Sequence, residues 1–118
     1  MSISLPESAF WILSALAVGR RHGYGIMQDV SQLSDGRTTL KVPTLYAALE
    51  RLERDGLIRT AGEEIVGGRA RRYFALTESG STALRDEAAR LQARARIATE
   101  RLAARPRATP AAGSAMFA

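Results

Sequence analysis

The chain has 118 residues, the usual size of one domain with a short extension. Its formal net charge is +5, its sequence pI is about 10.7, and Lys41 is its only lysine among many arginines. Cysteine is absent and His22 is the only histidine, which excludes disulfides, thiolate or multi-histidine metal sites and cysteine nucleophiles.

The basic balance points to a polyanionic partner such as nucleic acid, although net charge alone informs only solubility and non-specific binding. The preference for arginine over lysine has two explanations of equal weight. Arginine makes bidentate contacts to phosphate and guanine, and a GC-rich gene encodes arginine more often than lysine. The apolar run at 9–18 is too short to cross a bilayer, and no basic segment precedes it. We therefore expect a soluble, cytoplasmic protein that contacts no membrane.

Two helices are predicted in the first third of the chain. The first covers about 6–18, with Pro6 in its first turn and Gly19 after its end, and it is apolar on most sides, as a buried helix is. The second covers about 22–33, where apolar residues recur at helical spacing. Turn chemistry follows at Asp35-Gly36.

The clearest helix of the chain is predicted at 43–55. Pro43 suits its first turn, and Gly56 suits a left-handed residue after its end. Its apolar stripe consists of Leu45, Ala48, Leu49 and Leu52.

Two extended runs, about 57–65 and 70–77, flank the pair Gly67-Gly68, which is a hairpin turn signal. A cluster of cations follows the turn: Arg69, Arg71 and Arg72. The pattern predicts a two-stranded ribbon with a basic tip. The alternative reading of that tip is a solvated, arginine-rich turn.

A long last helix is predicted to begin after Thr77, a suitable N-cap, and to end near Arg105-Pro106. Gly80 stands where the glutamate of a capping box would be. A narrow seam with heptad-type spacing runs along this helix and consists of Leu84, Ala88, Leu91, Ala95, Ala98 and Leu102. We expect the seam to form a dimer interface, and packing on its own domain is the alternative.

This order of elements predicts a mainly α fold with a two-stranded β wing, that is, a winged helix-turn-helix with a long C-terminal dimerisation helix. The expected divisions are a DNA-binding domain at 1–77, the dimerisation helix at 78–105 and a disordered tail at 106–118. In such a module the third helix enters the major groove and the wing lies over the neighbouring backbone or minor groove.

The sequence resembles the short PadR-type transcriptional regulators over roughly residues 5–105. Three motifs carry the resemblance: HGYGI (22–26), PTLYAALERLERDGLI (43–58) and GGRARRYFALTESG (67–80). One departure is the start of the recognition helix, which reads Lys41-Val42-Pro43-Thr44 where many relatives have Ser-Pro-Gly/Ser-Thr. The resemblance implies a homodimer that binds inverted-repeat operators in double-stranded DNA, represses promoters, and is released by a small-molecule effector.

The same resemblance implies which residues contact DNA. Thr44 and Tyr46 are expected on phosphates or base edges, although Tyr46 could instead pack in the core. Arg51 is a further candidate, with ion pairs to neighbouring acids as its alternative. The full set of expected DNA contacts is Lys41, Thr44, Tyr46, Arg51, Gly68, Arg69, Arg71 and Arg72.

Phe10 and Trp11 are the candidate effector residues, although core packing is the stronger reading for both. A protein-binding winged-helix module without specific DNA binding is the alternative function. An enzyme is not expected, because the sequence shows no paired catalytic carboxylates, phosphate-binding loop or nucleophile elbow. No cofactor and no metal are expected.

Overall fold

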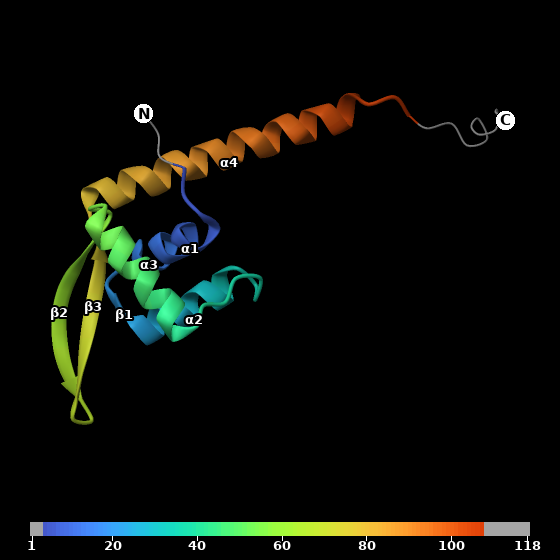
Figure 1. Cartoon of the computed structure of the whole chain (residues 1–118). Coiled ribbons are helices and arrows are strands. Elements are labelled where there is room, and N and C mark those ends of the chain that lie inside the picture. Colours follow the sequence, from blue (N-terminus) through green and yellow to red (C-terminus); the bar gives the residue numbers. More distant parts are fainter. Residues whose placement is uncertain (1–3, 108–118) are drawn as a thin grey trace. The chain divides into compact units, whose positions relative to one another are not determined.

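A computed structural model describes residues 4–107 as four helices and three short strands (Figure 1). The order is α1 (Glu7–Leu16), β1 (Arg21–His22), α2 (Gly23–Leu33), α3 (Val42–Arg54), β2 (Ile58–Val66), β3 (Arg69–Leu76) and α4 (Glu78–Ala104). None of the helices in this range is long and apolar enough to cross a membrane. The tail predicted at 106–118 lies outside the described residues, apart from Pro106 and Arg107.

The hydrophobic core lies between the first three helices and the base of the β2–β3 hairpin, which we call the wing. Burying each large core side chain contributes roughly 1.5–3 kcal/mol, so this cluster stabilises the helix arrangement. The stripe predicted for α3 supplies three of its members. The buried core residues are Ala9, Ile12, Leu13, Leu16, Ile26, Val30, Leu45, Leu49, Leu52, Leu57, Ile58 and Phe74.

The sheet has three strands in the order β1-β3-β2, so the prediction of a two-stranded ribbon missed β1. β1 is only two residues long, and its Arg21 and His22 pair antiparallel with Phe74 and Tyr73. A strand this short cannot show the alternating pattern by which strands are recognised in a sequence. It forms because the chain that enters α2 lies beside β3.

The wing is closed by the predicted glycine turn. Val66 pairs with Arg69, which leaves Gly67 and Gly68 as a two-residue loop with φ of 57° and 77°. Positive φ at both positions is what the favoured hairpin turns require. The register between β2 and β3 shifts between Thr60 and Glu63, so the wing also contains a β-bulge.

Helix α4 begins as predicted, with Thr77 as its N-cap. The Thr77 hydroxyl accepts a hydrogen bond from the Gly80 N–H (3.0 Å) and donates one to the Gly56 carbonyl (2.7 Å). A Cβ atom on Gly80 would collide with the Leu57 carbonyl, so a larger residue does not fit here. The absent capping-box glutamate is therefore explained by the close approach of α4 to the chain at Leu57.

The chain divides into two compact units, Met1–Ala88 and Ala89–Ala118. In the first unit, Ala83 and Leu84 of α4 pack against the hydrophobic core. In the second unit, Leu91, Ile97 and Leu102 are exposed, the last at 63% of its surface.

Candidate nucleic-acid interface

Helix α3 presents polar and aromatic side chains at its N-terminal end. It begins at Val42, one residue earlier than predicted, with Lys41 as its N-cap and Pro43 in the first turn. The Lys41 side chain makes no capping hydrogen bond, and Lys41 and Thr44 are both exposed. These side chains are therefore accessible to a ligand, while the opposite face of α3 is buried in the core.

A cavity of about 190 Å³ joins three elements of the first unit: the first turn of α2, helix α3 and the wing. We call it the tyrosine–arginine cavity. Its lining combines hydroxyl and guanidinium donors, which suits an anion such as phosphate. The lining residues are His22, Gly23, Tyr24, Tyr46, Val66, Arg69, Ala70, Arg71 and Arg72.

Tyr46 reaches this cavity because Gly23 has no side chain. A Cβ atom on Gly23 would lie 2.9 Å from Cζ of Tyr46, closer than side chains tolerate. The Tyr46 ring thus packs over the first residue of α2 and yet remains 44% exposed. Tyr46 is not part of the hydrophobic core, so the alternative reading of core packing is not realised, and its contact with DNA stays a prediction.

The charges of the wing are balanced along its length but not at its tip. In the strand register, Arg72 pairs with Glu63 and Arg71 with Glu64, whereas Arg69 pairs with the apolar Val66. Arg69 is also exposed. The cationic character of the wing therefore concentrates at Arg69, beside the glycine turn.

Arg72 lies over the ring of Phe74 on β3. Its guanidinium is 5.1 Å from the centroid of the Phe74 ring, so its stem follows the apolar face of β3 and only its end is free to contact a partner.

His22 is at the inner edge of the cavity and caps α2. The Gly25 N–H donates a hydrogen bond to its Nδ1 (3.2 Å), and its ring contacts Tyr73 edge-to-face at 5.5 Å between centroids. Burial lowers the pKa of His22 below 6.5, and the nearby Arg71 lowers it further against the opposing effect of Glu64. The imidazole is therefore neutral at pH 7, which the Nδ1 acceptor role also requires.

Arg51 does not line the tyrosine–arginine cavity. It lines a different cavity, of about 140 Å³, between the segment before α1 and the C-terminal half of α3. Between residues 4 and 107, no ion pair joins it to Glu50, Glu53 or Asp55, so the alternative reading of local ion pairs is not realised, and its contact with DNA stays a prediction.

Phe10 and Trp11 are half-buried on α1 and stack edge-to-face, with 5.0 Å between ring centroids. Trp11 packs against the core, and its indole N–H donates to the Glu7 carboxylate (2.7 Å).

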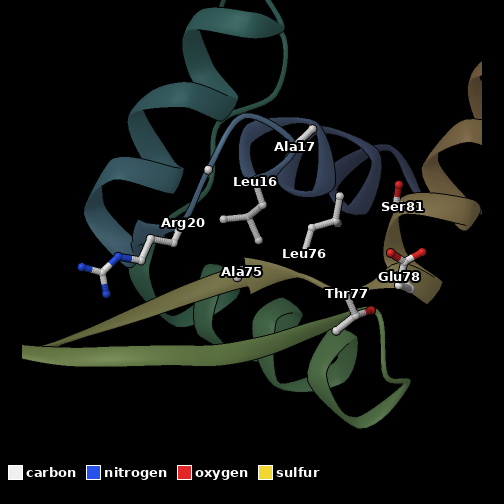
Figure 2. A pocket seen from close by; sticks show the side chains of 9 residues that line it. Leu16, Ala17, Arg20, Ala75, Leu76, Thr77, Glu78 and Ser81 are labelled. Atoms are coloured by element: carbon white, nitrogen blue, oxygen red, sulfur yellow. The ribbon is translucent and has the colours of Figure 1, made fainter.

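A further cavity of about 320 Å³ lies where the end of α1 meets β3 and the first turn of α4 (Figure 2). Leu16 and Leu76 contribute apolar surface, whereas Glu78 and Ser81 contribute polar groups from α4. Its size is at the lower end for small-molecule sites. Phe10 and Trp11 do not line it.

His22 and Tyr24 were not among the expected DNA contacts, yet both line the tyrosine–arginine cavity. Their position in HGYGI, at the start of a helix, was the one feature of the sequence that could have indicated a functional role. The sequence did not indicate that the wing, more than 40 residues later, lies beside them. No cluster of three or more potential metal ligands occurs within the described range.

Comparison with known proteins agrees with this architecture. The model of the transcriptional regulator PadR-like family matches residues 12–86. A transcriptional regulator of Mycobacterium tuberculosis is 36% identical over 89 residues, which cover 72% of this chain and 76% of that protein.

Two solved structures share the fold. A PadR family transcription regulator of Clostridium difficile superposes with a TM-score of 0.68 at 26% identity, covering 82% of this chain and 99% of that one. Bacillus subtilis PadR, crystallised with operator DNA, superposes with a TM-score of 0.59 at 22% identity, covering 86% and 50%. The chain belongs to the PadR-like family of transcriptional regulators.

Proposed function

We propose that this protein is a dimeric, sequence-specific DNA-binding regulator that represses transcription from inverted-repeat operators. The observation that carries the proposal is the tyrosine–arginine cavity, because it gathers hydroxyl and guanidinium donors from α2, α3 and the wing. Such convergence is expected of a surface that holds a sugar–phosphate backbone. Membership of a family of transcriptional regulators supports the same conclusion.

In the proposed complex, the N-terminal end of α3 enters the major groove, where Lys41 and Thr44 are exposed. A backbone phosphate occupies the tyrosine–arginine cavity and accepts hydrogen bonds from Tyr46 and Arg71, with Tyr24 at its edge. Arg69 and Gly68 at the wing tip contact the adjacent backbone or minor groove. Phosphate contacts fix the register, and base contacts by α3 supply the sequence preference.

Dimerisation is assigned to α4. Beyond Ala88 its seam side chains Leu91 and Leu102 are exposed in the single chain. A second copy that covers the seam removes this apolar surface from water, at roughly 25 cal/mol per Å². Residues 1–77 are proposed as the DNA-binding part and 78–105 as the dimerisation helix. The two protomers then contact operator half-sites about 34–36 Å apart on the DNA.

Release by an effector is the part of the proposal that rests on the family resemblance. A compound that acts in this way must bind the DNA-free dimer more tightly than the complex. Titration of candidate aromatic compounds into the preformed complex, followed by fluorescence anisotropy of labelled DNA, measures this difference directly.

The decisive experiment compares Arg69→Ala with Arg59→Ala. Both remove one exposed arginine from the wing, but Arg59 is at its base, where it pairs with Ala75. We expect Arg69→Ala to weaken binding to the upstream region of the protein's own gene and to random duplex alike. Because the dimer loses two phosphate contacts, the slope of log K against log salt should become shallower by about 1.8.

Arg59→Ala is expected to leave both affinities and the slope close to wild type. Thr44→Ala should instead reduce the ratio of specific to random affinity, since Thr44 is exposed at the end of α3 that enters the major groove. An unchanged slope in Arg69→Ala would refute the wing assignment. Absence of any wild-type shift at low salt, with a defined protein captured instead, would favour the protein-binding alternative.

A further inference from the structure

The net positive charge of this protein does not reside in its winged-helix unit. Residues 1–88 carry eleven basic and eleven acidic side chains and are therefore neutral overall. The second unit holds the other six arginines and a single acid, Glu100, all within residues 89–107. The whole formal charge of +5 thus belongs to the distal part of α4 and the few residues after it.

Three of these arginines lie along the end of α4. Arg94 and Arg101 are seven residues apart, which places them on one face at 3.6 residues per turn, and Arg105 directly follows the last helical residue, Ala104. All three are exposed. We call them the arginine stripe; it borders the apolar seam, because Arg94 and Arg101 directly precede Ala95 and Leu102.

The arginine stripe is not neutralised by its own helix. No acidic residue stands three or four positions from Arg94, Arg101 or Arg105. The wing differs in this respect, because Arg71 and Arg72 stand opposite the acidic residues Glu64 and Glu63 in the strand register.

We propose that the arginine stripe is a second DNA-binding surface, which contacts the phosphate backbone of duplex DNA without reading its sequence. The inference rests on the proposed function, since it is the winged helix that brings an operator to the protein. The neutral winged-helix unit provides the sequence-dependent contacts, and the stripe adds much of the charge-dependent affinity.

Duplex DNA fits the stripe better than a folded partner does. Arg94 and Arg101 are about 10 Å apart along the helix axis, and DNA carries one charge per about 1.7 Å of its own axis, so phosphates meet both arginines in any register. A second copy of the distal helix cannot neutralise it, because that segment offers only Glu100, and Glu100 is not on the stripe's face. Pairing of two distal helices therefore leaves both stripes unneutralised.

The test compares two double variants of the full chain. Arg94→Gln/Arg101→Gln removes two charges from the stripe, and Arg85→Gln/Arg96→Gln removes two from the other side of the same helix. We expect the stripe variant to bind random duplex and operator DNA more weakly, with a salt slope shallower by up to about 3.6 per dimer. The ratio of specific to random affinity should stay within about twofold. The control should keep the wild-type slope.

Sedimentation establishes that both variants are dimers, and Arg94→Lys/Arg101→Lys should restore the slope, because phosphate contact needs charge rather than a guanidinium. The inference is overturned if the stripe variant binds DNA like wild type, or if the control loses as much affinity. Those results leave the proposed function intact when wild type binds DNA. Failure of wild type to bind any duplex at low salt would instead refute the proposed function itself.

Discussion

At the scale of single residues, His22 connects the start of α2 with the wing. Its Nδ1 accepts a hydrogen bond from the Gly25 N–H, its ring contacts Tyr73, and the charges of Arg71 and Glu64 act on its pKa in opposite directions. Protonation removes the acceptor and places a cation near Arg71. The neutral form of His22 is therefore the one compatible with the folded wing.

His22 should make the stability of the protein depend on pH. Because its pKa is lowered in the folded state, the unfolded chain binds a proton that the folded chain does not, at pH values between the folded pKa and 6.5. The free energy of unfolding should thus fall as the pH drops through this window and saturate below it. Urea unfolding at pH 7.5 and 5.5 measures the difference.

His22→Asn supplies the control, since asparagine is a good N-cap that does not titrate in this range. The variant should be about as stable as wild type at pH 7.5 and lose less stability at pH 5.5. Equal losses in the two proteins would show that other groups cause the pH dependence.

At positions 23 and 80, contacts with residues distant in sequence leave no room for a side chain, so glycine is required there. Both stand in the first turns of helices, where glycine costs roughly 0.5–1 kcal/mol relative to alanine. Gly23 admits the ring of Tyr46, and Gly80 admits the carbonyl of Leu57. In each case the close approach explains a residue that weakens the helix by itself.

At the scale of elements, the wing is anchored at its bulge by Arg20, Ala61 and Tyr73, which we call the Arg20 cluster. The Arg20 guanidinium donates a hydrogen bond to the Ala61 carbonyl (2.8 Å) and lies 4.3 Å from the centroid of the Tyr73 ring. The Tyr73 hydroxyl in turn donates to Glu64 (2.7 Å). A residue that precedes α2 thereby joins both strands of the wing.

Arg20→Ala should loosen the wing without unfolding the core. Losing a charged hydrogen bond and a cation–π contact should cost about 1–2 kcal/mol, and amides of β2 and β3 near the bulge should exchange faster with solvent. Arg21→Ala is the matched control, because Arg21 forms a surface ion pair with Asp29 at 3.4 Å, worth at most about 1 kcal/mol. Equal exchange rates in the two variants would contradict a role for the Arg20 cluster.

At the scale of the whole molecule, function depends on the proposed pairing of two chains through α4. Leu91→Gln/Leu102→Gln puts two polar groups on the seam, and Glu100→Gln puts the same side chain off the seam. We expect the seam variant to sediment as a monomer, because the exposed apolar surface no longer favours association. Glu100→Gln should remain a dimer.

The seam variant should also bind an inverted-repeat operator at least tenfold more weakly, since a monomer contacts a single half-site. Circular dichroism should show a folded winged-helix unit, whose core does not include Leu91 or Leu102. A dimeric seam variant with wild-type affinity would refute the assignment of α4 as the dimer interface.

The sequence by itself determined those features of this protein that depend on near neighbours in the chain. The apolar face of α3, the turn at Gly67-Gly68 and the N-cap at Thr77 were all predicted and are present. Helical periodicity, left-handed backbone and capping are properties of a few consecutive residues. The order of the predicted elements added the fold class, and the DNA and dimer contacts stay predictions.

Only the tertiary structure decided features that join distant segments. β1 exists because it lies beside β3, and Arg20 reaches a carbonyl 41 residues later. The structure also separated Arg51 from the cavity that Tyr46 and the wing arginines share. Long-range packing depends on the simultaneous placement of several elements, and no local pattern in the sequence records it.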